Sequence, residues 1–123
     1  MNYDLAIIGG GAAGMAAAVF ASENGVHTVV IEHNRQLGKK LAITGKGRCN
    51  VTNNSDNDNI MKNIPTGSRF LYSALAGFSA YDTMNFFEGL GVPLKTERGN
   101  RVFPVSDSAK DIVEALKKRM CTL

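Results

Sequence analysis

The chain has 123 residues, of which 44% are hydrophobic and 20% charged, the proportions of a single globular domain. Its net charge is +3, and the basic residues gather between Arg35 and Arg48, where no acid occurs. That segment contains no aromatic residue, which excludes the mixed basic and aromatic surface of a nucleic-acid-binding protein. No stretch is apolar enough to span a membrane, no secretory signal precedes the first strand, and Cys49 and Cys121 match no metal-ligand spacing. We therefore expect a cytoplasmic protein without a metal site.

The first predicted elements are a strand over residues 3–8 and a glycine-rich turn at 9–14 with the pattern G-x-G-x-x-G. Gly9 permits the tight turn, Gly11 lets a pyrophosphate approach the backbone, and Gly14 lets the following helix lie close to the strand. The N–H groups at the start of that helix, around Ala12 and Ala13, attract phosphate. The pattern predicts a dinucleotide-binding loop; the alternative is a glycine-rich turn that binds nothing.

A helix over residues 12–24, a left-handed C-cap at Gly25 and a buried strand over 28–31 follow in the order of a βαβ unit. Glu32 ends this strand 18 residues after Gly14. A carboxylate at that place accepts hydrogen bonds from ribose hydroxyls and repels a 2′-phosphate. We therefore assign Glu32 to the cofactor site. Its neighbour His33 is included as a residue within reach of adenine, although a structural or solvated role is the favoured interpretation of this histidine.

Residues 33–67 lose clear periodicity. We expect a short helix over 39–43, a glycine loop over 44–48 and a looser asparagine-rich connector over 50–63. The basic loop fits phosphates or a small anion, and the alternative is a solvated loop.

Two helices over 68–78 and 79–88 carry aromatic residues at helical spacing. Ordinary packing is the favoured interpretation of these rings, with a wall that stacks on flavin or substrate as the alternative. A short hairpin pairs residues 93–97 with 101–103, and a final helix begins at Ala109. The expected fold is therefore α/β, with a parallel sheet, a helical segment and a short hairpin.

A second motif, over residues 38–53, is far more selective than the glycine turn. It reads G-K-K-L-A-I-T-G-K-G-R-C-N-V-T-N and is similar to the signature of the BaiN/RdsA-type NAD(P)/FAD-dependent oxidoreductases, some of them labelled aminoacetone oxidase-like. The resemblance covers the chain to about Lys118 and implies an FAD-binding domain, with NAD(P)H as a possible electron donor. It adds a set of expected cofactor-binding residues from this motif: Lys39, Lys40, Thr44, Gly45, Gly47, Arg48, Cys49 and Asn50.

Members of that family are several times longer than this chain, so residues 1–123 resemble the N-terminal portion of a Rossmann-like FAD-binding domain. We expect this portion alone to retain FAD weakly or not at all, not to be a competent oxidoreductase, and to self-associate through an incomplete sheet. The alternatives are a catalytically inactive dinucleotide-binding remnant and an NAD-binding module. Catalytic residues and the substrate are not identified. The adjacent Arg48 favours a thiolate at Cys49, but without a second nearby cysteine for a disulfide relay we interpret Cys49 as a packed neighbour of the flavin loop.

Overall fold

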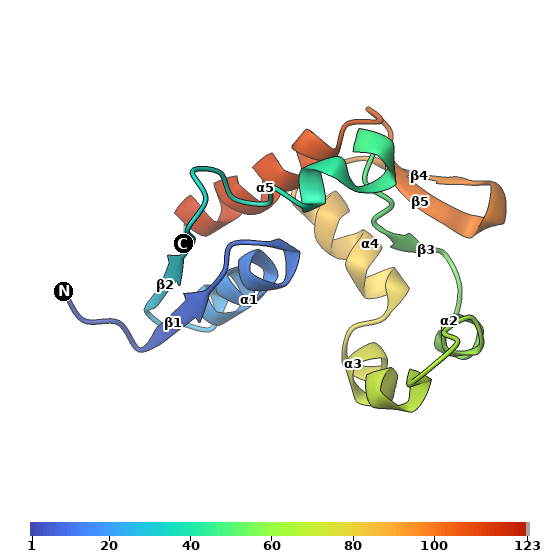
Figure 1. Cartoon of the computed structure of the whole chain (residues 1–123), viewed down its shortest axis with the longest axis horizontal. Coiled ribbons are helices and arrows are strands. Elements are labelled where there is room, and N and C mark those ends of the chain that lie inside the picture. The colour runs from blue at the N-terminus through green and yellow to red at the C-terminus, as the bar shows by residue number, and fades with distance from the viewer. Residues whose placement is uncertain (123) are drawn as a thin grey trace.

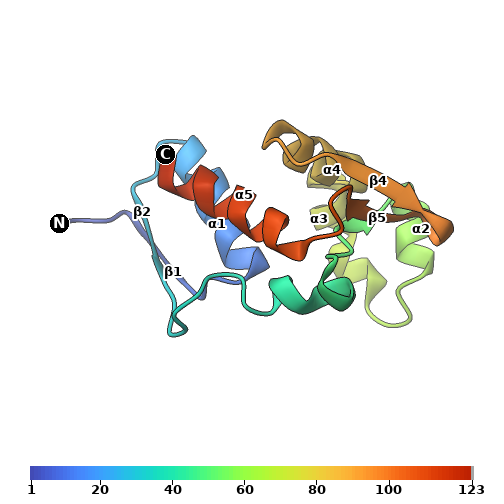
Figure 2. The same cartoon turned by 90° about the horizontal axis from the view of Figure 1, so that it is seen from above.

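The computed structural model describes residues 1–122. Figure 1 shows a βαβ unit at one end of the molecule and a hairpin with short helices at the other. The C-terminal helix α5 (Ala109–Thr122) connects the two ends, and Figure 2 shows it running beside α1 (Ala12–Glu23).

The N-terminal unit has the predicted parallel βαβ arrangement. Strand β1 (Leu5–Ile8) pairs in parallel with β2 (Thr28–Ile31), with α1 between them in sequence. The strand begins at Leu5 and not at Tyr3, and the helix ends one residue before the expected Asn24. Gly25 lies directly after Asn24, the C-cap of α1, and adopts φ +78°, as expected for a left-handed residue at a helix end.

The core lies between α1 and α5. Met15 and Val19 of α1 and Ile112 and Leu116 of α5 are each at most 2% exposed. On α5 the buried positions recur at helical spacing, so one apolar stripe faces α1. Burial of this stripe attaches the C-terminal helix to the βαβ unit.

A second sheet has three short antiparallel strands in the order β3-β5-β4. The predicted hairpin is confirmed: β4 (Leu94–Glu97) pairs with β5 (Arg101–Pro104), joined by the 3-10 turn η3 (Arg98–Asn100). On the other side, β3 (Thr52–Asn53) pairs with β5.

The expectation of a loose connector over residues 50–63 is wrong. Strand β3 is held by β5, and helix α2 (Asn57–Lys62) begins where the Asp56 carboxylate accepts a hydrogen bond from the N–H of Asn59 at 2.8 Å. Asparagine and aspartate favour turns when nothing competes, but here one of them caps a helix and neighbouring residues pair with a distant strand.

The middle of the chain follows the predicted helices with shifted bounds. A 3-10 segment η1 (Leu41–Gly47) replaces the short helix expected at 39–43, and the segment 68–78 divides into η2 (Ser68–Leu71) and α3 (Tyr72–Gly77). Helix α4 (Ala80–Gly89) starts with a capping box between Ser79 and Asp82, which satisfies N–H groups at its first turn.

The face of the parallel sheet that lies away from α1 is apolar and open. Ile7 faces α1, where its methyl group lies near Gly14, so Ile8 points the other way. Ile8 is 79% exposed, and its register partner Ile31 is 53% exposed. Among residues 1–122, no helix has the length and apolar character to cross a membrane.

Candidate dinucleotide site

Each glycine of the first motif has a distinct environment. Gly9 adopts φ +101°, which only glycine adopts readily. A Cβ on Gly14 would overlap the carbonyl oxygen of Gly9, so the close contact of helix and strand requires glycine there. A Cβ on Gly11 would meet no heavy atom of the described chain within 4 Å, so the space beside this exposed residue is open. The turn at Gly9 and the close packing at Gly14 are as predicted from the pattern, and the role of Gly11 toward a pyrophosphate stays a prediction.

The Glu32 carboxylate lies at the end of β2, directly beside the glycine loop. Its Oε2 accepts a hydrogen bond from the Gly10 N–H at 2.9 Å, and its Oε1 accepts one from the Asn34 N–H at 3.2 Å. These bonds stabilise the charged form, the Gly10 bond most, and hold the pKa of Glu32 below its ordinary value. Glu32 is therefore an oriented, ionised acceptor.

The two sequence motifs are joined through the backbone. The Gly38 N–H donates to the Gly10 carbonyl at 2.7 Å, while the Gly10 N–H donates to Glu32. Gly38 is buried with φ +65°, and a Cβ there would lie 3.0 Å from methyl groups of Met15 and Val113. The start of the second motif is thus fixed against the first.

Further along, both motifs line one apolar cavity of about 310 Å³. Ala12 and Ala13, in the first turn of α1, form one part of its lining. Cys49 and Asn50 of the second motif form another part. The structure therefore brings the helix N-terminus and the end of the signature segment to the same space.

Phenylalanine rings complete the cavity. Phe20, Phe78 and Phe86 line it and also contact one another: Phe20 stacks on Phe86 with ring centroids 5.2 Å apart, and Phe78 meets Phe20 edge-on at 5.4 Å. The rings therefore pack against one another, as the favoured interpretation predicts, and stacking on a flavin or substrate stays a prediction.

Several predicted cofactor-binding side chains lie outside this cavity. The side chain of His33 is 89% exposed, with its Nδ1 3.1 Å from Oε1 of Glu32. Lys39 and Lys40 are exposed on the loop between β2 and η1. In η1, Gly45 and Gly47 are also exposed and Thr44 is half-buried. Their role toward a cofactor stays a prediction.

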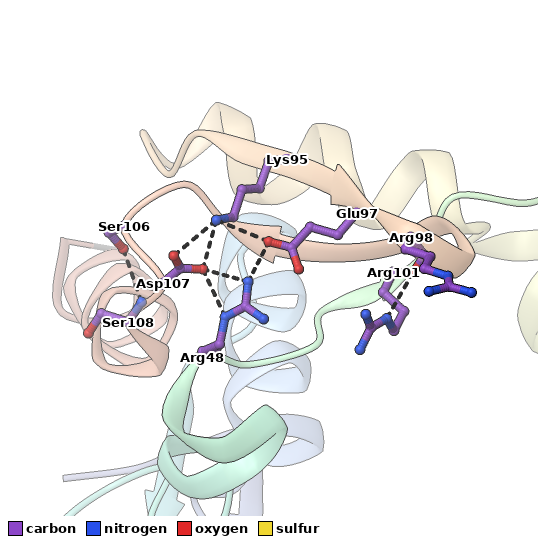
Figure 3. A network of polar contacts seen from close by, with 8 residues as sticks. All are labelled: Arg48, Lys95, Glu97, Arg98, Arg101, Ser106, Asp107 and Ser108. Atoms are coloured by element: carbon purple, nitrogen blue, oxygen red, sulfur yellow. Dashed lines mark hydrogen bonds and ion pairs between the residues drawn. The ribbon is translucent and has the colours of Figure 1, made fainter.

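Arg48 points toward the β4–β5 hairpin (Figure 3). Its guanidinium pairs with Glu97 and with Asp107, the latter at 2.8–2.9 Å, and lies 4.0 Å from the centre of the Phe103 ring. Lys95 binds the same two carboxylates. The positive charge at Arg48 is thus balanced within the protein.

Cys49 is buried, with 2% of its surface exposed. Burial raises the pKa of its thiol, because the thiolate is poorly solvated there. Arg48 therefore does not favour the thiolate, and Cys49 is packed in the interior as the sequence predicts; its place beside a flavin stays a prediction.

Sequence reasoning missed four residues that shape the site. Gly10 and Gly38 belong to the two motifs, so their positions in these patterns could have indicated that they are part of the site. Glu97 and Asp107 lie 49 and 59 residues from Arg48, and no local pattern identifies them as its partners.

The fold and this loop define a Rossmann-type α/β domain. The sequence profile described as the HI0933-like protein Rossmann domain matches residues 3–123, and the chain belongs to this family. This result confirms the resemblance to the BaiN/RdsA-type proteins.

Similar proteins include two bacterial enzymes. The chain is 34% identical over 118 residues to a 3-dehydro-bile acid delta(4,6)-reductase of Clostridium scindens, and 32% identical over 115 residues to a ribosomal RNA dihydrouridine synthase of Escherichia coli. Each match covers 94% of this chain, which spans 28% of the length of either relative.

A solved structure, that of Thermovibrio ammonificans THI4, superposes with a TM-score of 0.60 at 12% identity, covering 98% of this chain and 35% of the other. This similarity supports the Rossmann-like fold class predicted from the sequence.

Proposed function

We propose that this chain is the FAD-binding portion of a flavin-dependent oxidoreductase. One observation carries the proposal: the oriented Glu32 carboxylate and the open backbone at Gly11 both lie where the parallel strands end, and the apolar cavity begins at the next residues, Ala12 and Ala13 of α1. Dinucleotides bind across that edge in folds of this kind.

The residues present fit the chemistry of each part of FAD. Glu32 has the acceptor oxygens for ribose hydroxyls, and the open space beside Gly11 allows a pyrophosphate to reach the N–H groups of the first turn of α1. A cavity lined by alanine and phenylalanine suits a flat, uncharged ring better than a charged nicotinamide. The last argument favours FAD over NAD.

The bound flavin would supply the electron transfer, and the protein supplies binding, orientation and electrostatics. Glu32 would hold the adenosine end by hydrogen bonds. The phenylalanine rings that line the cavity would exclude water from the other end. The names of the two bacterial relatives, a reductase and a dihydrouridine synthase, support a reductive or oxidative reaction on an organic substrate, with NAD(P)H as the proposed electron donor.

An equilibrium titration with FAD, NAD⁺ and NADP⁺ tests the proposal. We expect saturable binding of FAD, weaker binding of NAD⁺ and the weakest binding of NADP⁺, because Glu32 repels a 2′-phosphate. Glu32→Gln removes the charge and keeps the shape, and should weaken FAD binding about tenfold or more.

The matched control is Glu23→Gln, since Glu23 lies at the far end of α1, where it pairs with Arg119. Tighter binding of NAD⁺ than of FAD would favour an NAD-binding module. No binding of any dinucleotide would favour an inactive remnant.

A further inference from the structure

The turn from Gly45 to Cys49 has an unusual backbone. Gly45, Lys46, Gly47 and Cys49 all adopt φ between +56° and +84°. Glycine does so freely, but Lys46 and Cys49 carry side chains, and such residues keep a left-handed conformation only when their surroundings enforce it. Local hydrogen bonds contribute, since the Cys49 N–H donates to the Thr44 carbonyl at 3.0 Å.

The turn is also held from outside by Arg48. The guanidinium reaches Glu97 on β4 and Asp107 after β5, and it covers the ring of Phe103. The same ring approaches Gly45, where an added Cβ would lie 3.3 Å from it. Figure 3 shows Arg48 extending from the turn to this cluster. The hairpin therefore contacts the turn both at Gly45 and at Arg48.

The far end of these ion pairs is fixed as well. Asp107 itself has φ +57°, and its N–H donates to the Pro104 carbonyl at 2.9 Å. Lys95 binds both Asp107 oxygens, at 2.8 and 3.0 Å. Each carboxylate is thus shared by Arg48 and Lys95.

We propose that Arg48 is a positioning residue, whose ion pairs with Glu97 and Asp107 lock the Gly45–Cys49 turn onto the hairpin and so place Cys49 and Asn50 at the cavity. This deepens the proposed function and rests on it for the cofactor. Arg48 acts through the turn and not by touching a phosphate.

The reactivity of Cys49 with a thiol reagent tests the lock without any cofactor. In a Cys121→Ser background, Cys49 is the single thiol, and its 2% exposure keeps labelling slow. Arg48→Met should raise the labelling rate about three- to tenfold, and so should Asp107→Asn combined with Glu97→Gln. Asparagine tolerates the left-handed backbone at 107, so that variant removes the charges and keeps the shape of both side chains.

Arg98→Met is the matched control, because Arg98 is exposed on the turn of the same hairpin and none of the ion pairs drawn in Figure 3 involves its guanidinium; its labelling rate should stay within about twofold of the parent. The rate of labelling through local opening does not change at low urea concentrations. The rate of labelling through global unfolding rises with the urea concentration. Unchanged labelling in Arg48→Met, or an increase that grows with urea, would overturn the lock.

A titration with FAD separates the lock from a direct contact. If Arg48 positions the turn, Asp107→Asn weakens FAD binding, as Arg48→Met does. If Arg48 binds a phosphate, Asp107→Asn removes one of the two carboxylates that pair with the guanidinium and leaves FAD binding unchanged or tighter, which would contradict the proposal. If the unmodified chain binds no FAD, the proposed function fails while the labelling experiment still decides the role of Arg48.

Discussion

At the scale of single residues, the glycines of the first motif differ in what they do. Gly14 is required by packing, because a Cβ would overlap the backbone of Gly9, whereas Gly11 faces open space. The G-x-G-x-x-G pattern predicted both roles, since strand, turn and helix follow in order. The pattern could not reveal that Gly10 joins Glu32 to Gly38, because that link depends on how two loops meet.

Gly14→Ala should therefore destabilise the fold by about 1–3 kcal/mol, the usual cost of overpacking. Gly89→Ala is the control, because Gly89 lies in α4 with ordinary backbone angles and nothing in the described chain within 4 Å of an added Cβ. Chemical denaturation measures both. Equal stability of the two variants would show that Gly14 has room for a side chain.

At the scale of elements, the periodic segments were predictable and the long-range pairings were not. The βαβ unit, the hairpin and the final helix follow from apolar spacing and turn residues. Strand β3 has two residues and exists because β5 pairs with it, so its own sequence carries no signal. Likewise, the basic loop was expected to face phosphates, but the Arg48 side chain pairs with two carboxylates that lie far along the sequence, on and after the hairpin.

The ion cluster on this hairpin should show a defined pH dependence. Arg48 and Lys95 hold the pKa of Glu97 below its ordinary value, and Lys95 and Arg48 do the same for Asp107. Carboxylates whose pKa is lowered in the folded state stabilise the fold at pH values above their unfolded-state pKa of about 4. This contribution is lost as the pH falls through the folded-state pKa.

Thermal unfolding from pH 7 to pH 2.5 checks this, with the variant Glu97→Gln and Asp107→Asn beside the parent. The parent should unfold at the higher temperature above about pH 5, and the difference should shrink below about pH 4. A difference that stays constant over this range would show that the two carboxylates do not contribute through their charge.

At the scale of the whole molecule, the parallel sheet has two strands within residues 1–122, and its outer face exposes Ile8 and Ile31. Unpaired strand edges and apolar faces promote association. We expect the 123-residue chain, studied on its own, to self-associate at high concentration and to show no steady NAD(P)H oxidation above that of free FAD.

Ile8→Lys should shift the chain toward monomer in sedimentation velocity experiments, because a charge then lies on the apolar face. Phe70→Lys is the control, since Phe70 is 89% exposed and lies in η2, away from the sheet. Similar effects of the two substitutions would place the association elsewhere.

The central claim is that a dinucleotide lies against the backbone at Gly11, and one titration tests it most directly. Gly11→Ala fits the observed backbone, with φ −81° and no heavy atom of the described residues near the added Cβ, so its stability should change by less than about 1 kcal/mol. We predict saturable FAD binding to the unmodified chain and binding at least about tenfold weaker in Gly11→Ala, because the methyl group occupies the space of the pyrophosphate. Equal affinity of the two chains for FAD would contradict the account.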